Sequence, residues 1–356
     1  MQILINITFT LALMFWPIMF MMSPMMLDAP GSENDRSHIS VMMLVLCYPI
    51  GLFILLWIFG GNYFGFSGFK LTFVSSLIIV SAFSLFGYFG MLFNLHKGIS
   101  NSGYSVADNN VYYSAKLIEG ADSQSFKFLD NDDIYSDTDY AIDRDNLYYR
   151  GKIVEDANIE NLKKLTIHRD TYWLNNTQVI YDGRVLTKAL PGNFSGFDDY
   201  DGWTASDNED HYIVFSYGIA LPTVDKDTFT PLNDFMAKDR LHIFEKNKQI
   251  LTGADAATFR LFEDHNFASD KNHIYYLATK APFSIDGADI DSFEILDRGY
   301  LKDKTSVYKV HQYESIEKLP LADARSFEAT QYDDANRSEA RDINHYYYDG
   351  KIVGDR

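Results

Sequence analysis

The residues of this chain that could do chemistry are mainly carboxylates, and they are densest in one short segment. Asp198, Asp199 and Asp201 lie almost side by side there. Carboxylate oxygens are the ligands that Ca²⁺ prefers, although a complete EF-hand loop also needs Gly at its sixth position, where this segment has Trp203. The segment therefore predicts a calcium site at Asp198, Asp199 and Asp201, and solvated turn residues are the alternative interpretation.

Signatures of the common catalytic classes are missing from the sequence. It has no Cys-x-x-Cys pair, no His-Glu-x-x-His helix, no Gly-x-Ser-x-Gly elbow, no P-loop and no Gly-x-Gly-x-x-Gly fingerprint. The single cysteine, Cys47, lies in an apolar segment, so the polar part of the chain has no thiol. We therefore expect no catalytic residue and no cofactor. A pair of glycosidase-type carboxylates among the many acids stays open as an alternative.

One sequence motif recurs along the chain after about Lys97. An Asp-initiated turn leads into a run of β-branched and aromatic residues, and an Ala-Asp pair with a nearby Phe follows. Copies of the turn begin near Asp108, Asp143, Asp170, Asp207, Asp239, Asp270, Asp303 and Asp342. A recurring unit of this length is typical of stacked or radial repeat proteins.

Each half of the motif has a physical interpretation. Asp and Asn bond their own downstream backbone and so reverse the chain into a strand. Gly151-Lys152 and Gly350-Lys351, which follow aromatic pairs, predict hairpin tips. The Asp of Ala-Asp could cap one helical turn, and the Phe after it would then pack into a core layer. The Phe residues at this position are Phe126, Phe259, Phe293 and Phe327.

These features predict a mostly β repeat domain over residues 97–356. It would consist of stacked β-hairpin or meander repeats with short helical turns, and either a solenoid-like or a propeller-like arrangement would satisfy the pattern. In each Tyr-Tyr pair, one ring should lie in the core and its neighbour should face outward, because side chains alternate along a strand.

The turn motif also resembles the signature of a known family. Asp270-Lys271-Asn272 with Tyr275-Tyr276, and the weaker copy Asp143-Arg144-Asp145 with Tyr148-Tyr149, are similar to the signature of the DKNYY family of bacterial repeat proteins. The resemblance covers most of residues 108–353. It implies a repeat architecture but no activity, since the function of that family is unknown.

A functional site should lie where the repeat pattern breaks, because repeats supply the same residues to every copy. The copy between Thr171 and Asp210 fits the pattern worst. Trp173, Trp203 and His211 lie in or beside that stretch, and we therefore predict them as binding residues. An aromatic ring offers a flat face to a sugar or a peptide, although cross-strand packing is the commoner role of such rings in sheets.

The first 96 residues are of a different kind. Residues 3–27, 39–59 and 71–95 are apolar runs of about the length that crosses a bilayer, and none contains Lys, Arg, Asp or Glu in its interior. They predict a transmembrane region of about three helices. The first run could instead be a cleavable signal, although it has no basic start.

The net charge of the chain limits the kinds of partner that it can bind. The chain carries a net charge of -18, and removing Arg36, Lys70, Asp28, Glu33 and Asp35 leaves 29 basic and 46 acidic residues, or -17, for residues 97–356. Such a surface repels nucleic acid. The sequence thus predicts a bacterial inner-membrane protein that contacts lipid through its helices. Its periplasmic repeat domain would bind or scaffold a protein or glycan, with an envelope hydrolase as the alternative.

Overall fold

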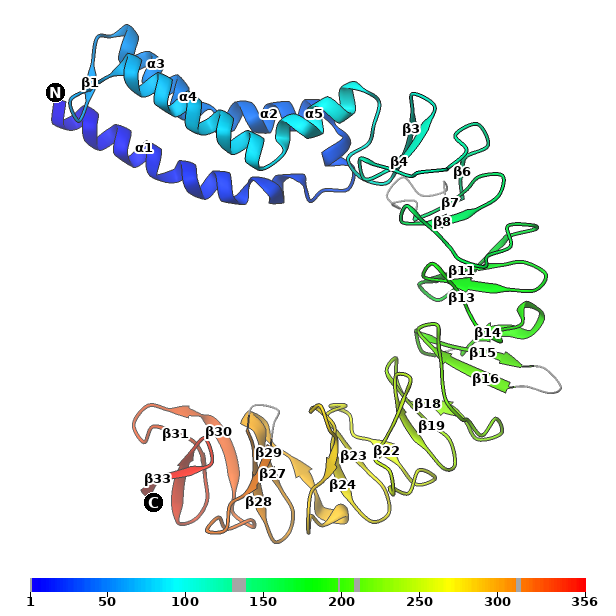
Figure 1. The fold of residues 1–356 in the computed structure, drawn as a ribbon. Coiled ribbons are helices and arrows are strands. Elements are labelled where there is room, and N and C mark those ends of the chain that lie inside the picture. The colour runs from blue at the N-terminus through cyan, green and yellow to red at the C-terminus, as the bar shows by residue number, and fades with distance from the viewer. Residues whose placement is uncertain (1, 130–138, 198, 208–211, 312–314) are drawn as a thin grey trace. The chain divides into compact units, whose positions relative to one another are not determined.

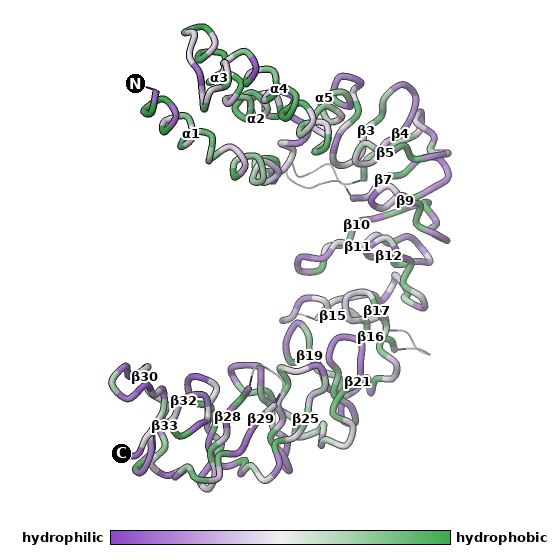
Figure 2. The backbone as a smooth tube through the Cα atoms, turned by 60° about the vertical axis from the view of Figure 1, so that its left-hand side comes forward, coloured by the Kyte–Doolittle hydropathy of each residue, from purple (hydrophilic) through white to green (hydrophobic). Residues whose placement is uncertain are grey.

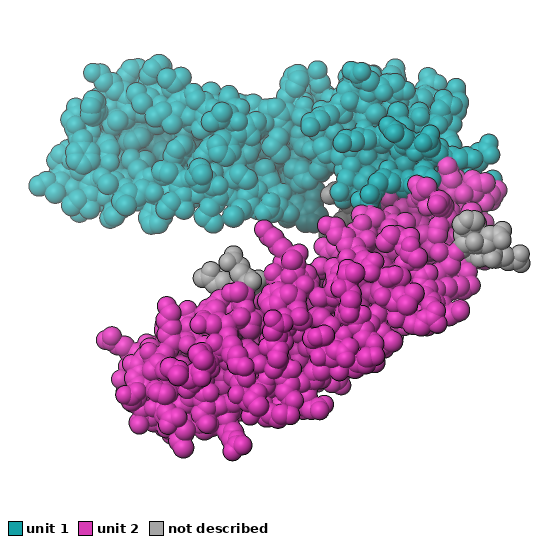
Figure 3. Space-filling model, turned by 60° about the horizontal axis from the view of Figure 1, so that its bottom comes forward, with its two compact units in different colours: residues 1–162, 182–185 teal, residues 163–181, 186–356 magenta. Residues whose placement is uncertain are grey.

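The chain forms two compact units. The computed structural model describes residues 2–129, 139–197, 199–207, 212–311 and 315–356. Unit 1 consists of residues 1–162 and 182–185, and unit 2 of residues 163–181 and 186–356 (Figure 3). Within the described residues, the α-helices lie in unit 1, and unit 2 is built from strands and short 3-10 turns (Figure 1).

Unit 1 begins with the apolar helices. Their bounds are α1 Gln2–Met22, α2 Arg36–Leu46, α3 Tyr48–Ile58, α4 Gly68–Leu85 and α5 Tyr88–His96, with 3-10 turns η1 Ser23–Leu27 and η2 Ser32–Asn34. The predicted span 39–59 is bent by 47° between α2 and α3, because Pro49 in the first turn of α3 cannot continue the preceding helix. The predicted span 71–95 is divided at Gly87, whose φ of 77° is left-handed.

The helices pack around a small core and leave their other faces apolar. Ile39, Phe83 and Tyr88 are buried between them. Large apolar side chains are exposed on the helices, among them Leu44, Leu77 and Leu85. The helical part of the chain is largely hydrophobic in composition (Figure 2). By length and composition, Gln2–Leu27 and Gly68–Leu85 could each cross a membrane, and the bent pair α2 and α3 would be a third span.

The loop between α1 and α2 is bonded to the segment that leads into the first sheet. Asn34 Nδ2 donates to Ser102 Oγ at 2.9 Å, and Asn34 Oδ1 accepts the Asn101 N–H at 2.7 Å. The hairpin of β1 (Asn62–Tyr63) and β2 (Phe66–Ser67) lies instead beside the first half of α1. Within unit 1, the N-terminus and the first sheet therefore lie at opposite ends of the helices (Figure 1).

The remainder of each unit consists of short antiparallel sheets, mostly with four strands joined in chain order. In unit 1 the strands are β3 Tyr104–Ala107, β4 Asn110–Tyr113, β5 Lys116–Leu117, β6 Lys127–Phe128, β7 Tyr140–Ile142, β8 Leu147–Tyr149, β9 Lys152–Ile153 and β13 Arg184–Val185. In unit 2 they are β10 Lys163–Ile167, β11 Asp170–Leu174, β12 Val179–Tyr181, β14 Phe194–Gly196, β15 Trp203–Asp207, β16 Tyr212–Ser216, β17 Ile219–Ala220, β18 Thr230–Pro231, β19 Met236–Lys238, β20 Ile243–Glu245, β21 Lys248–Ile250, β22 Arg260–Leu261, β23 Phe267–Ser269, β24 Ile274–Tyr276, β25 Phe283–Ser284, β26 Glu294–Ile295, β27 Tyr300–Lys302, β28 Val307–His311, β29 Ser315–Lys318, β30 Glu328–Asp333, β31 Ser338–Arg341, β32 His345–Tyr348 and β33 Lys351–Asp355. The 3-10 turns are η3 Pro191–Asn193, η4 Ile290–Ser292 and η5 Asp297–Gly299. The predicted predominance of β structure is confirmed.

In the four-stranded sheets the repeated turn connects the second and third strands, and the structure places one copy differently from the sequence prediction. Asp170 begins β11 and so does not initiate such a turn, whereas Asp207 ends β15 and the residues that follow it lie outside the described part of the chain. In the sheet of β10 to β12 the turn begins at Asn175, whose Oδ1 accepts the N–H groups of Thr177 and Gln178. Asn can replace Asp here because its carbonyl oxygen makes the same local bonds.

Burial within the sheets follows the predicted layers only in part. Phe259 and Phe327 are buried, whereas Phe126 and Phe293 are half-buried. The prediction of one inward and one outward tyrosine is wrong for Tyr275 and Tyr276, which are both buried. Side chains alternate as expected, but this sheet packs against a neighbour on each face, so both rings lose contact with water.

Candidate functional site

The Asp of the repeated turn is the most heavily bonded carboxylate in a sheet, and we call this arrangement the Asp clamp. Asp270 is 3% exposed. Its Oδ1 accepts the N–H groups of Asn272 and His273 at 2.6 and 2.8 Å. Its Oδ2 accepts the Asp255 N–H and the Tyr275 hydroxyl, both at 2.7 Å. One side chain therefore closes its own turn and holds the preceding Ala-Asp turn.

The clamp recurs with the same atoms in other sheets. Oδ2 of the clamp Asp accepts a tyrosine hydroxyl at Asp143, Asp303 and Asp342. At Asp239 the partner is His242 Nδ1, at 3.1 Å. The recurring sequence Asp-x-x-x-x-Tyr therefore corresponds to this geometry. Its tyrosine hydroxyl donates a hydrogen bond that stabilises the turn.

The second Asp of each repeat stabilises the short turn before the clamp. The Asp255 side chain accepts the N–H and the hydroxyl of Thr258, and it is paired with Lys271 Nζ at 2.6 Å. Asp289 and Lys304 form the same pair at 2.7 Å. The Lys of the Asp-Lys-Asn sequence therefore has a defined partner in the same sheet.

The clamp carboxylates are held in their ionised form. Burial by itself raises the pKa of Asp270, but hydrogen bonds from the Asp255 N–H, the Tyr275 hydroxyl and two turn N–H groups outweigh it and lower the pKa below its ordinary value. The ion pair with Lys271 and the bonds from Thr258 lower the pKa of Asp255 to about 2. Among the described carboxyl groups, every resolved pKa shift is downward. A general acid at neutral pH needs the opposite shift.

The residues predicted from the irregular stretch are mostly core residues. Trp203 is fully buried, and its Nε1 donates to the Asn233 carbonyl at 2.8 Å. Trp173 is 5% exposed. His211 lies outside the described residues. The two tryptophan rings therefore pack within the sheets and offer no open face to a ligand.

The predicted calcium ligands are not assembled into a site within the described residues. Asp201 is paired with Arg169, whose Nε donates to its Oδ2 at 2.7 Å. Asp199 is described but Asp198 is not. In the part of the chain that the structure describes, no three His, Cys, Asp or Glu side chains are grouped closely enough to hold a metal ion.

Successive sheets are connected by a second repeated contact, which we call the tip joint. The Tyr that begins the strand before the repeated turn accepts a hydrogen bond from the Gly N–H at the hairpin tip of the next sheet. The pairs are Tyr104 with Gly151 at 2.9 Å and Tyr140 with Gly183 at 2.8 Å in unit 1, and Tyr300 with Gly350 at 3.0 Å in unit 2. A Cβ on Gly183 would lie 2.4 Å from the Tyr149 ring, so the tip must be glycine.

The tip joint between the sheet of β26 to β29 and the sheet of β30 to β33 also contains a buried ion pair. Lys309, which is 5% exposed, lies 4.3 Å from the centre of the Tyr300 ring. Its Nζ contacts Glu339 Oε1 at 3.2 Å and donates to the Arg298 carbonyl at 2.6 Å. Glu339 Oε1 also accepts the Tyr300 hydroxyl. Each buried charge therefore has a bonded partner.

The joint between the sheet of β22 to β25 and the sheet of β26 to β29 has neither tip-joint partner. Phe267 takes the tyrosine position, since it pairs with Tyr276 as Tyr300 pairs with Lys309. The next hairpin is longer, with β28 and β29 pairing as far as His311 and Ser315, and its sequence contains no Gly between these strands.

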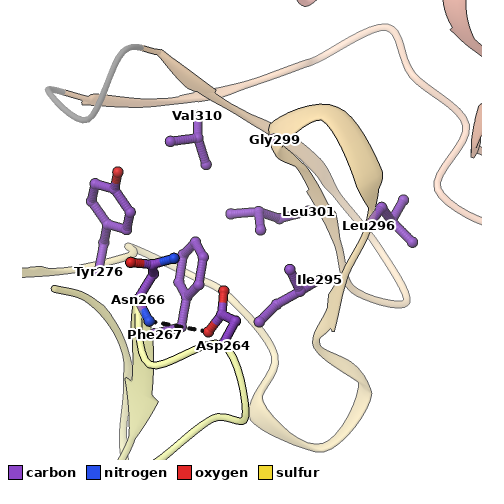
Figure 4. A pocket seen from close by; sticks show the side chains of 9 residues that line it. All are labelled: Asp264, Asn266, Phe267, Tyr276, Ile295, Leu296, Gly299, Leu301 and Val310. Atoms are coloured by element: carbon purple, nitrogen blue, oxygen red, sulfur yellow. Dashed lines mark hydrogen bonds between the residues drawn. The ribbon is translucent and has the colours of Figure 1, made fainter. Parts of the chain in front are cut away.

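A cavity of about 330 Å³ lies at this joint. Figure 4 shows Phe267, Tyr276 and Asp264 on one side of it and Leu301 and Val310 on the other. The cavity was not predicted from the sequence. The available signal was that the sequence after Tyr308 and Lys309 continues without a glycine tip, in contrast to Tyr149-Arg150-Gly151.

Comparison with known proteins gives one match. The sequence model described as the DKNYY family matches residues 104–279 and 279–351. No curated protein sequence and no solved structure matches the chain. The matched residues include all the Asp clamps and tip joints described above.

Proposed function

The chain belongs to the DKNYY family, and from the use of its carboxylates in that repeat we propose that it is a membrane-anchored binding or scaffolding protein without a catalytic centre. The observation that carries the proposal is the Asp clamp. Asp143, Asp270 and Asp303 are buried, ionised and bonded in the same way. A catalytic acid would have to depart from that arrangement with a raised pKa.

The helices support anchoring in a bilayer. Their outward side chains are apolar and exposed, as at Leu77 and Leu85, and such a surface is stable against lipid but not against water. The bonds of Asn34 to Ser102 and Asn101 hold the first sheet at the end of the helices that carries the α1–α2 loop. We place that end in the periplasm of a bacterial inner membrane, with the N-terminus in the cytoplasm.

The sheets of unit 2 support a stacked, solenoid-like arrangement for the repeats. Each tip joint or shared core connects a sheet to the next one along the chain, as Phe327 and Tyr347 do with Tyr300. A stack of this kind exposes the edges of many sheets, which suits the binding of an extended protein or glycan partner.

Membrane anchoring is tested by fractionation. The full chain should remain with membranes after alkaline washing and require detergent for release. Leu77→Arg places a charge on the exposed face of α4 and should reduce insertion, since a charge at mid-bilayer is unfavourable by about 3 kcal/mol. Val106→Arg, at an exposed apolar residue of β3, is the matched control and should not change fractionation. Release of the unaltered chain without detergent would contradict the proposal.

Orientation is tested by labelling introduced cysteines in a Cys47→Ser background. Glu119→Cys, in the sheet region, should react with an impermeant maleimide from the periplasmic side. Asn62→Cys, in the β1–β2 hairpin, should react only after the inner membrane is opened. The reverse pattern would place the repeat domain in the cytoplasm.

The absence of catalysis is tested separately with glycan, peptide and ester substrates. We expect no turnover above background. Turnover that disappears when one carboxylate is changed would support the envelope hydrolase instead.

A further inference from the structure

A cavity of about 330 Å³ lies between the sheets of β22 to β25 and β26 to β29, at a joint where both partners of the tip joint are replaced. At the neighbouring joint, Tyr300 and Gly350 bring the second strand and the next hairpin into contact. Here Phe267 has no hydroxyl to accept a bond, and Val310 of the longer hairpin lines the space.

The lining combines an apolar interior with a charged rim. Phe267 and Leu301 are buried, and Ile295 is 38% exposed at the mouth. Asp264 and Asn266 are exposed at the rim, on the turn that precedes β23. Asp264 Oδ1 accepts the Asn266 N–H at 3.1 Å, and the other carboxylate oxygen points towards the cavity (Figure 4). Sites for small molecules typically have this composition and volume.

We propose that this cavity binds a small organic amine with an apolar body. The aromatic and aliphatic walls would enclose the body, and the Asp264 carboxylate would receive the ammonium group. Residues 97–356 carry a net charge of -17 (29 basic against 46 acidic), which raises the local concentration of cations and repels anions. A neutral ligand of the same shape would lose the ion pair, and an acid would be repelled.

The inference rests on the binding role proposed for the repeat domain, but it does not depend on membrane insertion. Its test is a titration of the full chain in detergent with three probes of nearly equal shape: 2-phenylethylamine, 2-phenylethanol and phenylacetate. The amine should bind saturably, with an affinity about fivefold higher than that of the alcohol, which corresponds to one partly exposed ion pair. Phenylacetate should not bind.

Two variants and one control locate the binding. Asp264→Asn should lower the affinity for the amine to that for the alcohol, and it should fold, because Asn233 makes the same turn bond before β19. Asp333→Asn removes a comparable turn carboxylate in the sheet of β30 to β33 and should change nothing. Ile295→Trp should fill the mouth and abolish binding of both the amine and the alcohol.

Specific outcomes would overturn the proposal. These are no saturation by the amine up to about 10 mM, equal affinities for the amine and the alcohol, or equal effects of Asp264→Asn and Asp333→Asn. Failure here with detergent-dependent fractionation intact would remove the amine site and leave the membrane anchor. Failure of fractionation with specific amine binding would do the reverse.

Discussion

The two joints on either side of the sheet of β26 to β29 differ in what they contain. On one side, Tyr300, Lys309 and Gly350 fill the contact with hydrogen bonds and a buried charge. On the other side, Phe267 and Tyr276 face a cavity of about 330 Å³. Both joints connect sheets with the same Asp clamp, so the clamp maintains each sheet while the joint residues decide whether neighbouring sheets close together.

The largest expected effect comes from the buried charge at the closed joint. Lys309→Met removes one partner of the ion pair and leaves Glu339, 9% exposed, without its cation. The free energy of unfolding, measured by urea denaturation in detergent, should fall by about 3 to 5 kcal/mol. Adding Glu339→Met to Lys309→Met should recover most of the loss. A loss that persists in the double variant would mean that packing, and not the unpaired charge, dominates this joint.

The Asp clamp should matter equally on both sides of the comparison. Asp270→Asn and Asp303→Asn each replace an acceptor oxygen by an N–H₂ group facing other donors, and each should lower the free energy of unfolding at pH 7 by on the order of 3 kcal/mol. The folded-state pKa of both carboxyls is lowered, so their stabilisation is fully present above about pH 4 and is lost as pH falls through the folded-state pKa. The difference from the unaltered chain should therefore shrink in acid. Unequal losses would mean that the joints influence the clamps.

A smaller effect is expected from the tyrosine hydroxyl at the closed joint. Tyr300→Phe removes the acceptor of the Gly350 N–H and a donor to Glu339. The free energy of unfolding should fall by about 1 to 2 kcal/mol. Amine binding at the other joint should not change, and a change there would show that the two joints are coupled through the sheet between them.

The reciprocal change at the open joint should have the smallest effect. Phe267→Tyr adds the hydroxyl that Tyr300 supplies at the closed joint, but the sequence of the next hairpin has no tip glycine to donate to it. The free energy of unfolding should change by less than about 1 kcal/mol. A stabilisation comparable to the loss in Tyr300→Phe would mean that the hairpin can close over this ring, which would argue against a preformed cavity.

Local chemistry explains what could be predicted from the sequence of the repeats. The bonds from Asp270 to Asn272 and His273 join residues two and three positions apart, so the Asp-x-Asn pattern reports them directly. The glycine tips at Gly151 and Gly350 are predicted for the same reason, because a positive φ is required at the residue itself. Asn175 does not match the Asp pattern, although the two side chains make the same turn bond.

Contacts between distant residues explain what could not be predicted. Trp203 was predicted as a binding residue because it interrupts the repeat, but its ring is buried and its nitrogen is bonded to a carbonyl of the next sheet, at Asn233. Tyr276 was expected to alternate with Tyr275 between core and solvent, but a second sheet covers its face. In both cases burial depends on what packs on the sheet, which strand periodicity does not report.

The sequence by itself determined the division into apolar helices and an acidic β-rich part, the positions of most turns, and the membership in a repeat family. These depend on composition and on bonds between near neighbours in the chain. Only the tertiary structure decided which carboxylates serve the clamps, where Pro49 and Gly87 divide the apolar runs into shorter helices, and where a joint stays open. The cavity beside Phe267 depends on residues from two different sheets, and the space between sheets is set by their packing and not by either segment alone.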